Sequence, residues 1–132
     1  MKKIFLLACS IVLFSFSALA QCTTLYFSEY IEGSSNNKAI EIYNPTNASV
    51  DLSDYAVVRL NGGSSTPDTF GMSGMLAAYD VYVIANSSAD SVIKAAADTT
   101  GSATYYNGDD ALTLVKISTK TILDIFGTPG ND

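Results

Sequence analysis

The chain has 132 residues, with 13 Asp and Glu against 7 Lys and Arg, no histidine and a formal net charge of −6. An acidic chain of this size lacks the basic patch through which proteins bind the phosphate backbone of nucleic acids. The absence of histidine excludes a Ser-His-Asp triad, the common Cys-His pair and histidine-based zinc sites.

The first twenty residues have the pattern of a secretory signal peptide. Lys2 and Lys3 precede a long apolar run, and Ala18-Leu19-Ala20 places small residues at the −3 and −1 positions of a cleavage site. The run is shorter than the ~20 apolar residues that a membrane-spanning helix needs. We therefore expect removal of residues 1–20, a single domain over 21–132, a secreted or cell-surface location and no membrane anchor. The remaining chain has a net charge of −8 and Cys22 as its only cysteine, which excludes an internal disulfide.

The rest of the chain is typical of short strands separated by turns. Alternating apolar and polar residues predict strands over 25–31 and 39–44, with Leu25, Phe27 and Ile31 on the core face of the first and Tyr30 on the opposite face. Further strands are expected over 55–60, 69–72, 81–85, 111–115 and 121–126. The continuous apolar run 81–85 indicates a strand covered on both faces.

One segment, 91–97, favours a short helix, because it consists of good helix formers and follows a capping residue, Asp90. We interpret it as a crossover at the edge of the fold. Six to seven short strands spaced by roughly ten residues predict an all-β fold, an antiparallel β-sandwich.

The stretch 27–46, FSEYIEGSSNNKAIEIYNPT, followed by Val50-Asp51-Leu52-Ser53 and Tyr55, resembles the opening of bacterial lamin-tail domains. The segments 74–84, 107–114 (NGDDALTL) and 122–127 are similar to later strands of that family. The resemblance spans about 25–130 and implies an immunoglobulin-like sandwich. It also implies a non-enzymatic module of the kind often appended to extracellular nucleases, phosphatases or adhesin-like chains.

The chain departs from the family pattern at two places. Tyr79 stands where the family usually has a glycine, so the turn before Asp80 is expected to differ. The family pattern also continues beyond Asp132, often through a Trp-containing segment, whereas this chain has no Trp. We therefore expect a truncated gene product, a fragment of a longer secreted protein, or a shorter variant of the domain with an open sheet edge. Such an edge can pair with another chain.

Polar candidate residues gather in two loops, which we interpret as a binding surface: Glu32, Asn36, Asn37 and Lys38 in the first, Asn107, Asp109 and Asp110 in the second. Their oxygen atoms are also of the type that calcium prefers, although neither loop has EF-hand spacing. The second loop is equally typical of a simple turn. Tyrosines on the strands suggest an aromatic platform if they share one outward face.

Paired carboxylates are the remaining catalytic candidates. Glu29, Glu32 and Glu41 could serve as acid and base, because Glu29 and Glu41 lie on neighbouring strands if 33–38 closes a hairpin. We instead expect Glu29 to accept hydrogen bonds from nearby loop amides. Glu41 is expected to pair with Lys38 or Arg59. A small sandwich offers no deep cleft, so we expect no catalytic residue and no enzyme.

These observations predict a secreted, non-enzymatic binding or scaffolding module of lamin-tail type that contacts a protein or an extracellular or cell-surface component and needs no cofactor. The alternative is an accessory domain of a secreted metal-dependent nuclease or phosphatase, with calcium bound at the acidic loops.

The first prediction concerns the N-terminus. Protein secreted from the full sequence is expected to have the intact mass of a chain that begins at Gln21. Replacing Ala20 by Arg removes the small residue at the −1 position and is expected to block processing. Secreted wild-type protein that retains Met1 would contradict the cleavage.

Overall fold

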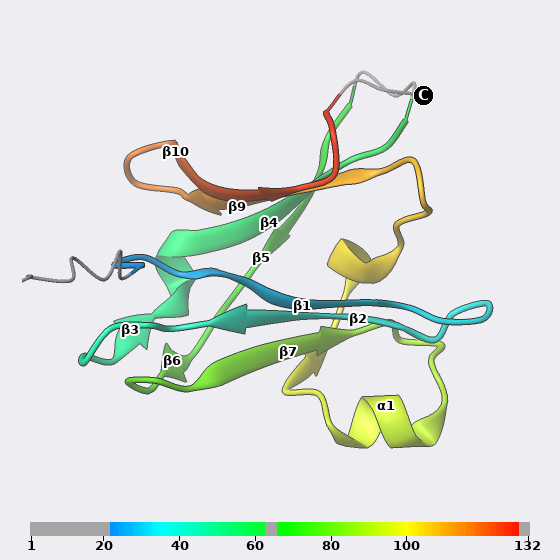
Figure 1. Cartoon of the computed structure of the whole chain (residues 1–132), viewed down its shortest axis with the longest axis horizontal. Helices are drawn as coiled ribbons and strands as arrows, with labels where there is room; N and C mark the ends of the chain where they lie inside the picture. The colour runs from blue at the N-terminus through cyan, green and yellow to red at the C-terminus, as the bar shows by residue number, and fades with distance from the viewer. Residues whose placement is uncertain (1–21, 63–65, 130–132) are drawn as a thin grey trace, which may run out of the picture.

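The computed structural model describes residues 22–62 and 66–129, so the expected signal peptide lies outside the described residues. Two four-stranded sheets pack face to face, with strand orders β1-β2-β7-β8 and β10-β9-β4-β5 (Figure 1). A small third sheet pairs β3 with β6. The strands are β1 (Tyr26–Glu32), β2 (Lys38–Tyr43), β3 (Val50–Asp51), β4 (Tyr55–Leu60), β5 (Asp68–Gly71), β6 (Met75–Leu76), β7 (Val81–Ala85), β8 (Thr99–Thr100), β9 (Ala111–Lys116) and β10 (Thr121–Phe126).

This arrangement confirms the expected β-sandwich, and every strand expected from the sequence is present with bounds shifted by at most two residues. Three two-residue strands, β3, β6 and β8, were not expected, because an alternation cannot show in two residues. All strand pairs are antiparallel except β7 and β8, which run parallel.

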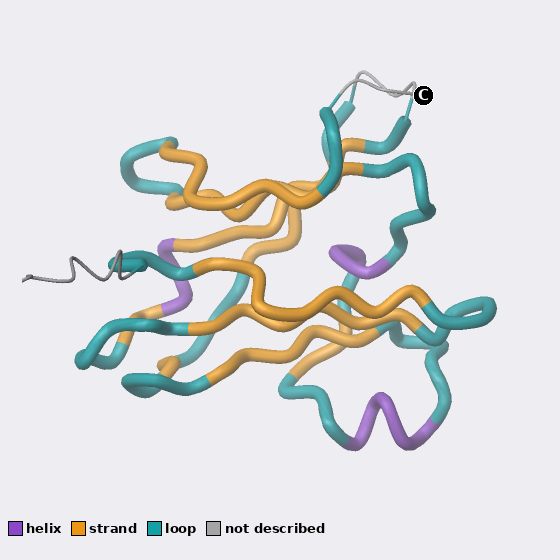
Figure 2. The backbone as a smooth tube through the Cα atoms, in the orientation of Figure 1, coloured by secondary structure: helices purple, strands orange, loops and turns teal. Residues whose placement is uncertain are grey.

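Three short helical segments lie among the strands (Figure 2). The expected helix is α1 (Ser91–Ala95), and the Asp90 carboxylate caps it by accepting a hydrogen bond from the Ile93 amide. It connects the parallel strands β7 and β8, which confirms the crossover. The other two are 3-10 turns, η1 (Leu52–Asp54) and η2 (Ser102–Thr104). No helix among the described residues has the length and apolar character needed to cross a bilayer.

The core lies between the two large sheets. Ile40 and Ile42 of β2 point inward together, as expected, and meet the facing sheet through Val57 and Leu114, all at most 2 % exposed. Burial of such side chains is the main stabilising contribution to a domain of this size. The buried cluster is completed by residues from every layer: Leu25, Leu52, Met72, Leu76, Ile84, Ala103, Tyr106 and Leu112.

A β-bulge in β1 reverses the expected faces of its second half. Phe27 lies opposite Ile42, but Glu29 lies opposite Glu41, so Ser28 is an extra residue in β1. An inserted residue shifts the two-residue alternation by one position. Tyr30 therefore packs on the core, and Ile31 is 43 % exposed. The expectation that Ile31 faces the core and Tyr30 faces outward was wrong for this reason.

The bulge lies where the two sheets approach each other at one edge. The Phe27 amide donates a hydrogen bond of 2.9 Å to the Asp124 carboxylate of β10, 97 residues away in sequence. β10 has its own register shift between Ile122 and Asp124. A side chain from one sheet thus binds a strand amide of the other, so the edge amide of Phe27 has a partner.

Strand β7 was expected to be covered on both faces, but its face away from the core is only partly covered. Ile84 and Ala85 are fully buried, but Val81 at the start of the strand is 36 % exposed. Helix α1 lies beside β7 and leaves its first residues uncovered (Figure 1).

The turn before β7 has an unusual backbone conformation at Tyr79. Its φ is +59°, in the left-handed region that favours glycine, and its side chain is 56 % exposed. Tyr79 thus adopts a backbone conformation that a glycine adopts at lower cost. The expectation that this turn differs from that of the family stays a prediction.

The second prediction follows from this strain. Replacing Tyr79 by Gly is expected to raise the free energy of unfolding by about 1 kcal/mol, because a left-handed conformation costs roughly that much for a residue with a β-carbon. The matched control is Gly74→Ala. Gly74 also has a positive φ, +96°, and open space around it, so this change is expected to lower stability by about the same amount. Urea unfolding measures both, and a destabilised Y79G variant would contradict the argument.

Candidate functional site

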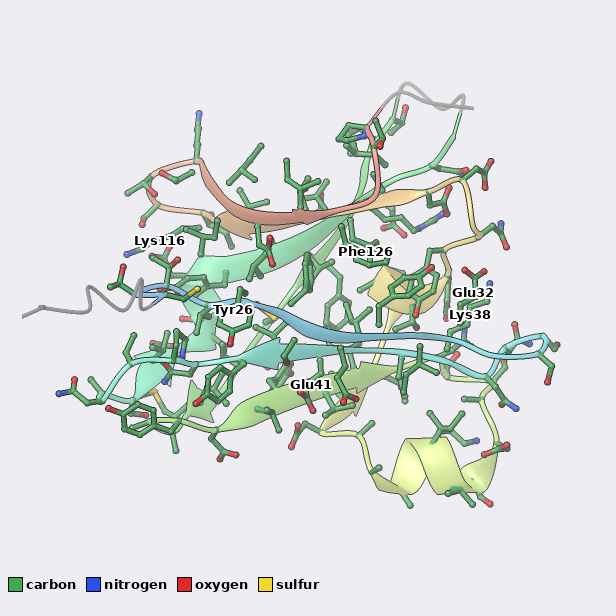
Figure 3. The ribbon with its side chains drawn as sticks, viewed as in Figure 1. Tyr26, Glu32, Lys38, Glu41, Lys116 and Phe126 are labelled. Carbon is green, nitrogen blue, oxygen red and sulfur yellow. The ribbon has the colours of Figure 1, made fainter. Side chains whose placement is uncertain are left out.

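The two loops expected to form a binding surface meet at one end of the sandwich. Glu32 ends β1 and lies opposite Lys38, which begins β2. The loop between them is closed by hydrogen bonds from the Gly33 amide to the Asn37 carbonyl and from the Asn37 amide to the Ser34 carbonyl. Two antiparallel strands joined in this way hold Glu32 and Lys38 side by side (Figure 3).

Lys38 joins the two loops. Its side chain is only 10 % exposed, and its Nζ lies 3.3 Å from Glu32 Oε1. The same Nζ donates hydrogen bonds to the Tyr106 carbonyl and to Asn107 Oδ1. It also lies 5.5 Å from the centre of the Tyr106 ring, within the range of a cation–π contact. A largely buried ammonium is stable only with such partners, so Lys38 fixes the second loop against the first.

Three aromatic rings form a stack beneath this contact. Tyr30 lies between Tyr106, at 4.5 Å, and Phe126, at 4.1 Å between ring centres. The Tyr30 hydroxyl donates to Glu32 Oε2, and the Tyr106 hydroxyl lies within hydrogen-bond distance of the Ile31 and Ala39 carbonyls. Burial, and then the neighbouring Glu32, raises the pKa of Tyr30 well above its usual value. Burial likewise raises the pKa of Tyr106, and both rings stay neutral at physiological pH.

Asp110 anchors the second loop from within. Its side chain is fully buried and accepts hydrogen bonds from Arg59 Nη1 at 3.1 Å, from the Gly62 amide and from the Asn107 amide. Arg59 Nη2 also lies 3.3 Å from Asp68 Oδ2. This carboxylate therefore fixes the turn that begins at Asn107.

A polar pocket of about 240 Å³ opens between the loops. Tyr105 is its most exposed aromatic residue, at 47 %, and its hydroxyl lies 3.1 Å from Ser87 Oγ. Side-chain amides and hydroxyls supply both donors and acceptors, whereas the one cation, Lys38, is already paired. The pocket suits uncharged groups that form hydrogen bonds. It is lined by Asn36, Lys38, Asn86, Ser88, Tyr105, Tyr106 and Asn107.

The predicted binding residues separate into three groups: those at the contact between the loops or in the pocket, those with structural partners, and one that is exposed. Lys38 directly contacts Glu32 and Asn107, and Asn36 lines the pocket. Asn37 and Asp110 have structural partners instead.

Asn37 pairs with Asp90, with its Nδ2 donating to the carboxylate and its Oδ1 accepting from the Asp90 amide. It therefore helps to hold the start of α1. Asp109 is exposed on the turn. The position of Asn37 therefore depends on a contact with a residue far away in the sequence.

Sequence reasoning missed Tyr105, Asn86 and Ser88 as pocket residues. Asn86 is only 4 % exposed, because its side chain donates to the Thr104 carbonyl and accepts from the Ser88 amide. The Tyr105-Tyr106 pair was a signal that an aromatic residue lies here. Which of the two is exposed depends on tertiary packing, since Tyr106 is 1 % exposed.

Two further expectations were wrong. Glu41 does not pair with a cation, because its Oε1 accepts a hydrogen bond of 2.6 Å from Ser28 Oγ, while Lys38 and Arg59 have other partners. The tyrosines do not share one outward face. Tyr26 and Tyr43 meet edge to face on one side of β1 and β2, whereas Tyr30 packs on the core.

The carboxylates of Glu32 and Asp110 already have protein partners. Both oxygens of Glu32 and both of Asp110 accept hydrogen bonds or ion pairs. Across 22–62 and 66–129, no three His, Cys, Asp or Glu side chains gather closely enough to hold a metal ion. The described arrangement thus gives no support to calcium at these loops.

The third prediction separates two adjacent carboxylates. Replacing Asp110 by Asn removes one of the two carboxylates that pair with the buried Arg59, and is expected to cost roughly 2 kcal/mol of unfolding free energy. The matched control is Asp109→Asn on the exposed turn, which is expected to change stability by less than about 0.5 kcal/mol. Urea unfolding compares them, and similar effects of the two changes would contradict the anchoring role of Asp110.

Comparison with known families agrees with this geometry. The model of the Lamin Tail Domain family matches residues 19–130, a range that includes both large sheets and both loops. No curated protein matches the chain. The sandwich is accordingly of the immunoglobulin-like type, and the domain is a non-catalytic binding or scaffolding module. The chain belongs to the lamin tail domain family.

Proposed function

We propose that this protein is secreted and acts as a non-enzymatic binding module for a protein or another component of the cell surface or extracellular space. The signal-peptide pattern of residues 1–20 supports secretion. The family supports a module that binds or scaffolds. The working surface is the loop pocket, defined as the cavity lined by Asn36, Lys38, Asn86, Ser88, Tyr105, Tyr106 and Asn107.

The observation that carries this proposal is the joining of two loops by one buried cation, through contacts that span 68 and 69 residues of sequence. Lys38 contacts Glu32 on its own hairpin, and it contacts the Tyr106 carbonyl and Asn107 on the other loop. These contacts hold the pocket walls in place before a partner arrives. A surface that is ordered in advance loses less conformational freedom on binding, and therefore binds more tightly for the same contacts.

The chemistry of the loop pocket favours an uncharged partner group. The exposed Tyr105 offers a ring face and a hydroxyl, and Asn36 and Asn107 offer amides. Such groups match a peptide main chain or a sugar hydroxyl. The partner is thus a protein or glycan surface with neutral hydrogen-bonding groups.

An accessory role beside an extracellular enzyme is compatible with this module, and the attached activity would then belong to another domain. Pairing of an open sheet edge with another chain stays a prediction. The edge strand β10 offers Ile122 and Ile125, which are 55 % and 46 % exposed. Exposed apolar side chains on an edge strand favour such pairing.

The fourth prediction tests the loop pocket by site-specific cross-linking. Tyr105 is replaced by the photoreactive residue p-benzoylphenylalanine, and the secreted protein is irradiated on the surface of the producing cells. We expect a discrete cross-linked product whose partner is identified by mass spectrometry. The matched control carries the same residue at Tyr79, another exposed tyrosine, 56 % exposed, outside the loop pocket.

A product from position 105 and none from position 79 would support the proposal. Equal yields at the two positions, or no product at 105, would count against the loop pocket as the working surface.

A further inference from the structure

A second groove lies on the outer face of the first sheet, away from the loop pocket. We call it the outer groove, and define it by Glu29, Ile31, Ala39, Ile40, Glu41, Val81 and Val83 of β1, β2 and β7 with Val92, Ile93 and Ala96 of the α1 segment. Its volume is about 440 Å³. Glu41 is labelled on this sheet in Figure 3.

The register of the strands places two carboxylates directly beside each other. Glu29 of β1 lies opposite Glu41 of β2, and Glu41 lies opposite Val83 of β7. Directly opposed side chains have β-carbons about 5 Å apart, and like charges in this position destabilise a sheet. Neither glutamate forms an ion pair with a described residue. The sheet thus carries an uncompensated negative row.

Apolar rows lie on both sides of this acidic row. Ile31 lies opposite Ala39 on one side, and Tyr43 lies opposite Val81 on the other. Ile31 and Val81 are 43 % and 36 % exposed, and Val92 on the helical wall is 78 % exposed. The outer groove therefore presents apolar, acidic and apolar surface in sequence along the strands.

We propose that the outer groove binds an extended segment of a partner protein in which a Lys or Arg stands between two apolar residues, each two positions away. In an extended chain, side chains on one face recur every two residues, or about 6.8 Å. This spacing equals the spacing of the rows beneath. The basic side chain would lie over Glu29 and Glu41, and its apolar neighbours would cover Ile31 and Val81.

Charge complementarity selects this occupant. A bound ammonium or guanidinium group relieves the repulsion between the two carboxylates and supplies a cation, which the lining of the outer groove lacks. The apolar neighbours remove exposed apolar surface from water. A neutral or acidic segment would gain the second contribution only, or would add to the repulsion.

The fifth prediction uses isotope-labelled protein produced from the whole sequence and the peptide acetyl-Ser-Val-Thr-Lys-Thr-Val-Ser-amide. Amide shifts in NMR spectra are followed during titration. We expect shifts at Ile31, Val83 and Ile93. The same peptide with its lysine acetylated keeps the side-chain stem but lacks the charge, and is expected to bind roughly tenfold more weakly.

Two protein variants test the acidic row. Glu29→Gln and Glu41→Gln are each expected to weaken binding roughly threefold, while leaving stability unchanged or slightly higher, since each removes a like-charge contact. The matched control is Asp51→Asn, which removes one surface charge on β3 and keeps a good capping residue. This control is expected to bind the peptide as the wild type does.

Three results would overturn the proposal. One is the absence of shifts in the outer groove, and another is equal binding of the charged and acetylated peptides. The third is a concentration-dependent shift of the same amides without peptide, which would make a second copy of the chain the occupant. Because the outer groove and the loop pocket are lined by different residues, cross-linking at Tyr105 can succeed or fail independently of this titration.

Discussion

The extra residue at Ser28 is the constraint on which both surfaces of this domain depend. Without it, the alternation of β1 would continue unchanged, Tyr30 would face outward and Ile31 would face the core. The β-bulge instead turns Tyr30 toward Tyr106 and Phe126, where its hydroxyl reaches Glu32. The same shift places Glu29 opposite Glu41 on the outside. One inserted residue thereby places Tyr30 against Tyr106, which lines the loop pocket, and forms the acidic row of the outer groove.

The two surfaces differ in whether their charged side chains have partners of opposite charge within the protein. At the loop pocket, Lys38 and Asp110 are buried, and each has several partners, so their charges are used to hold backbone in place. In the outer groove, Glu29 and Glu41 lie close together without a cation. Charges that are satisfied within a protein contribute to its rigidity, whereas charges that a fold leaves uncompensated are the ones available to a partner.

The fold was largely predictable from the sequence because its long strands carry clear two-residue alternation and its helix has a capping aspartate at the expected position. The two candidate loops were predicted to form one binding surface, but the contacts between them were not predicted. Lys38 is buried because Tyr106 and Asn107 of the second loop pack against it, and no local pattern in the sequence shows this. The bulge was not predicted, although Glu29 interrupts the apolar side of the alternation, because only the register with β2 shows that Ser28 is an extra residue.

The hydrogen bond between the Phe27 amide and Asp124 also makes the closure of β1 depend on a distant part of the chain. It joins one of the first strands to the last one across 97 residues, and contacts between such distant positions are slow to form. The hairpin of β1 and β2 can pair early, because its loop is short. Phe126, which completes the ring stack on Tyr30, arrives only with β10. In the folded domain, the contacts that close the edge of β1 are therefore complete only when β10 is in place.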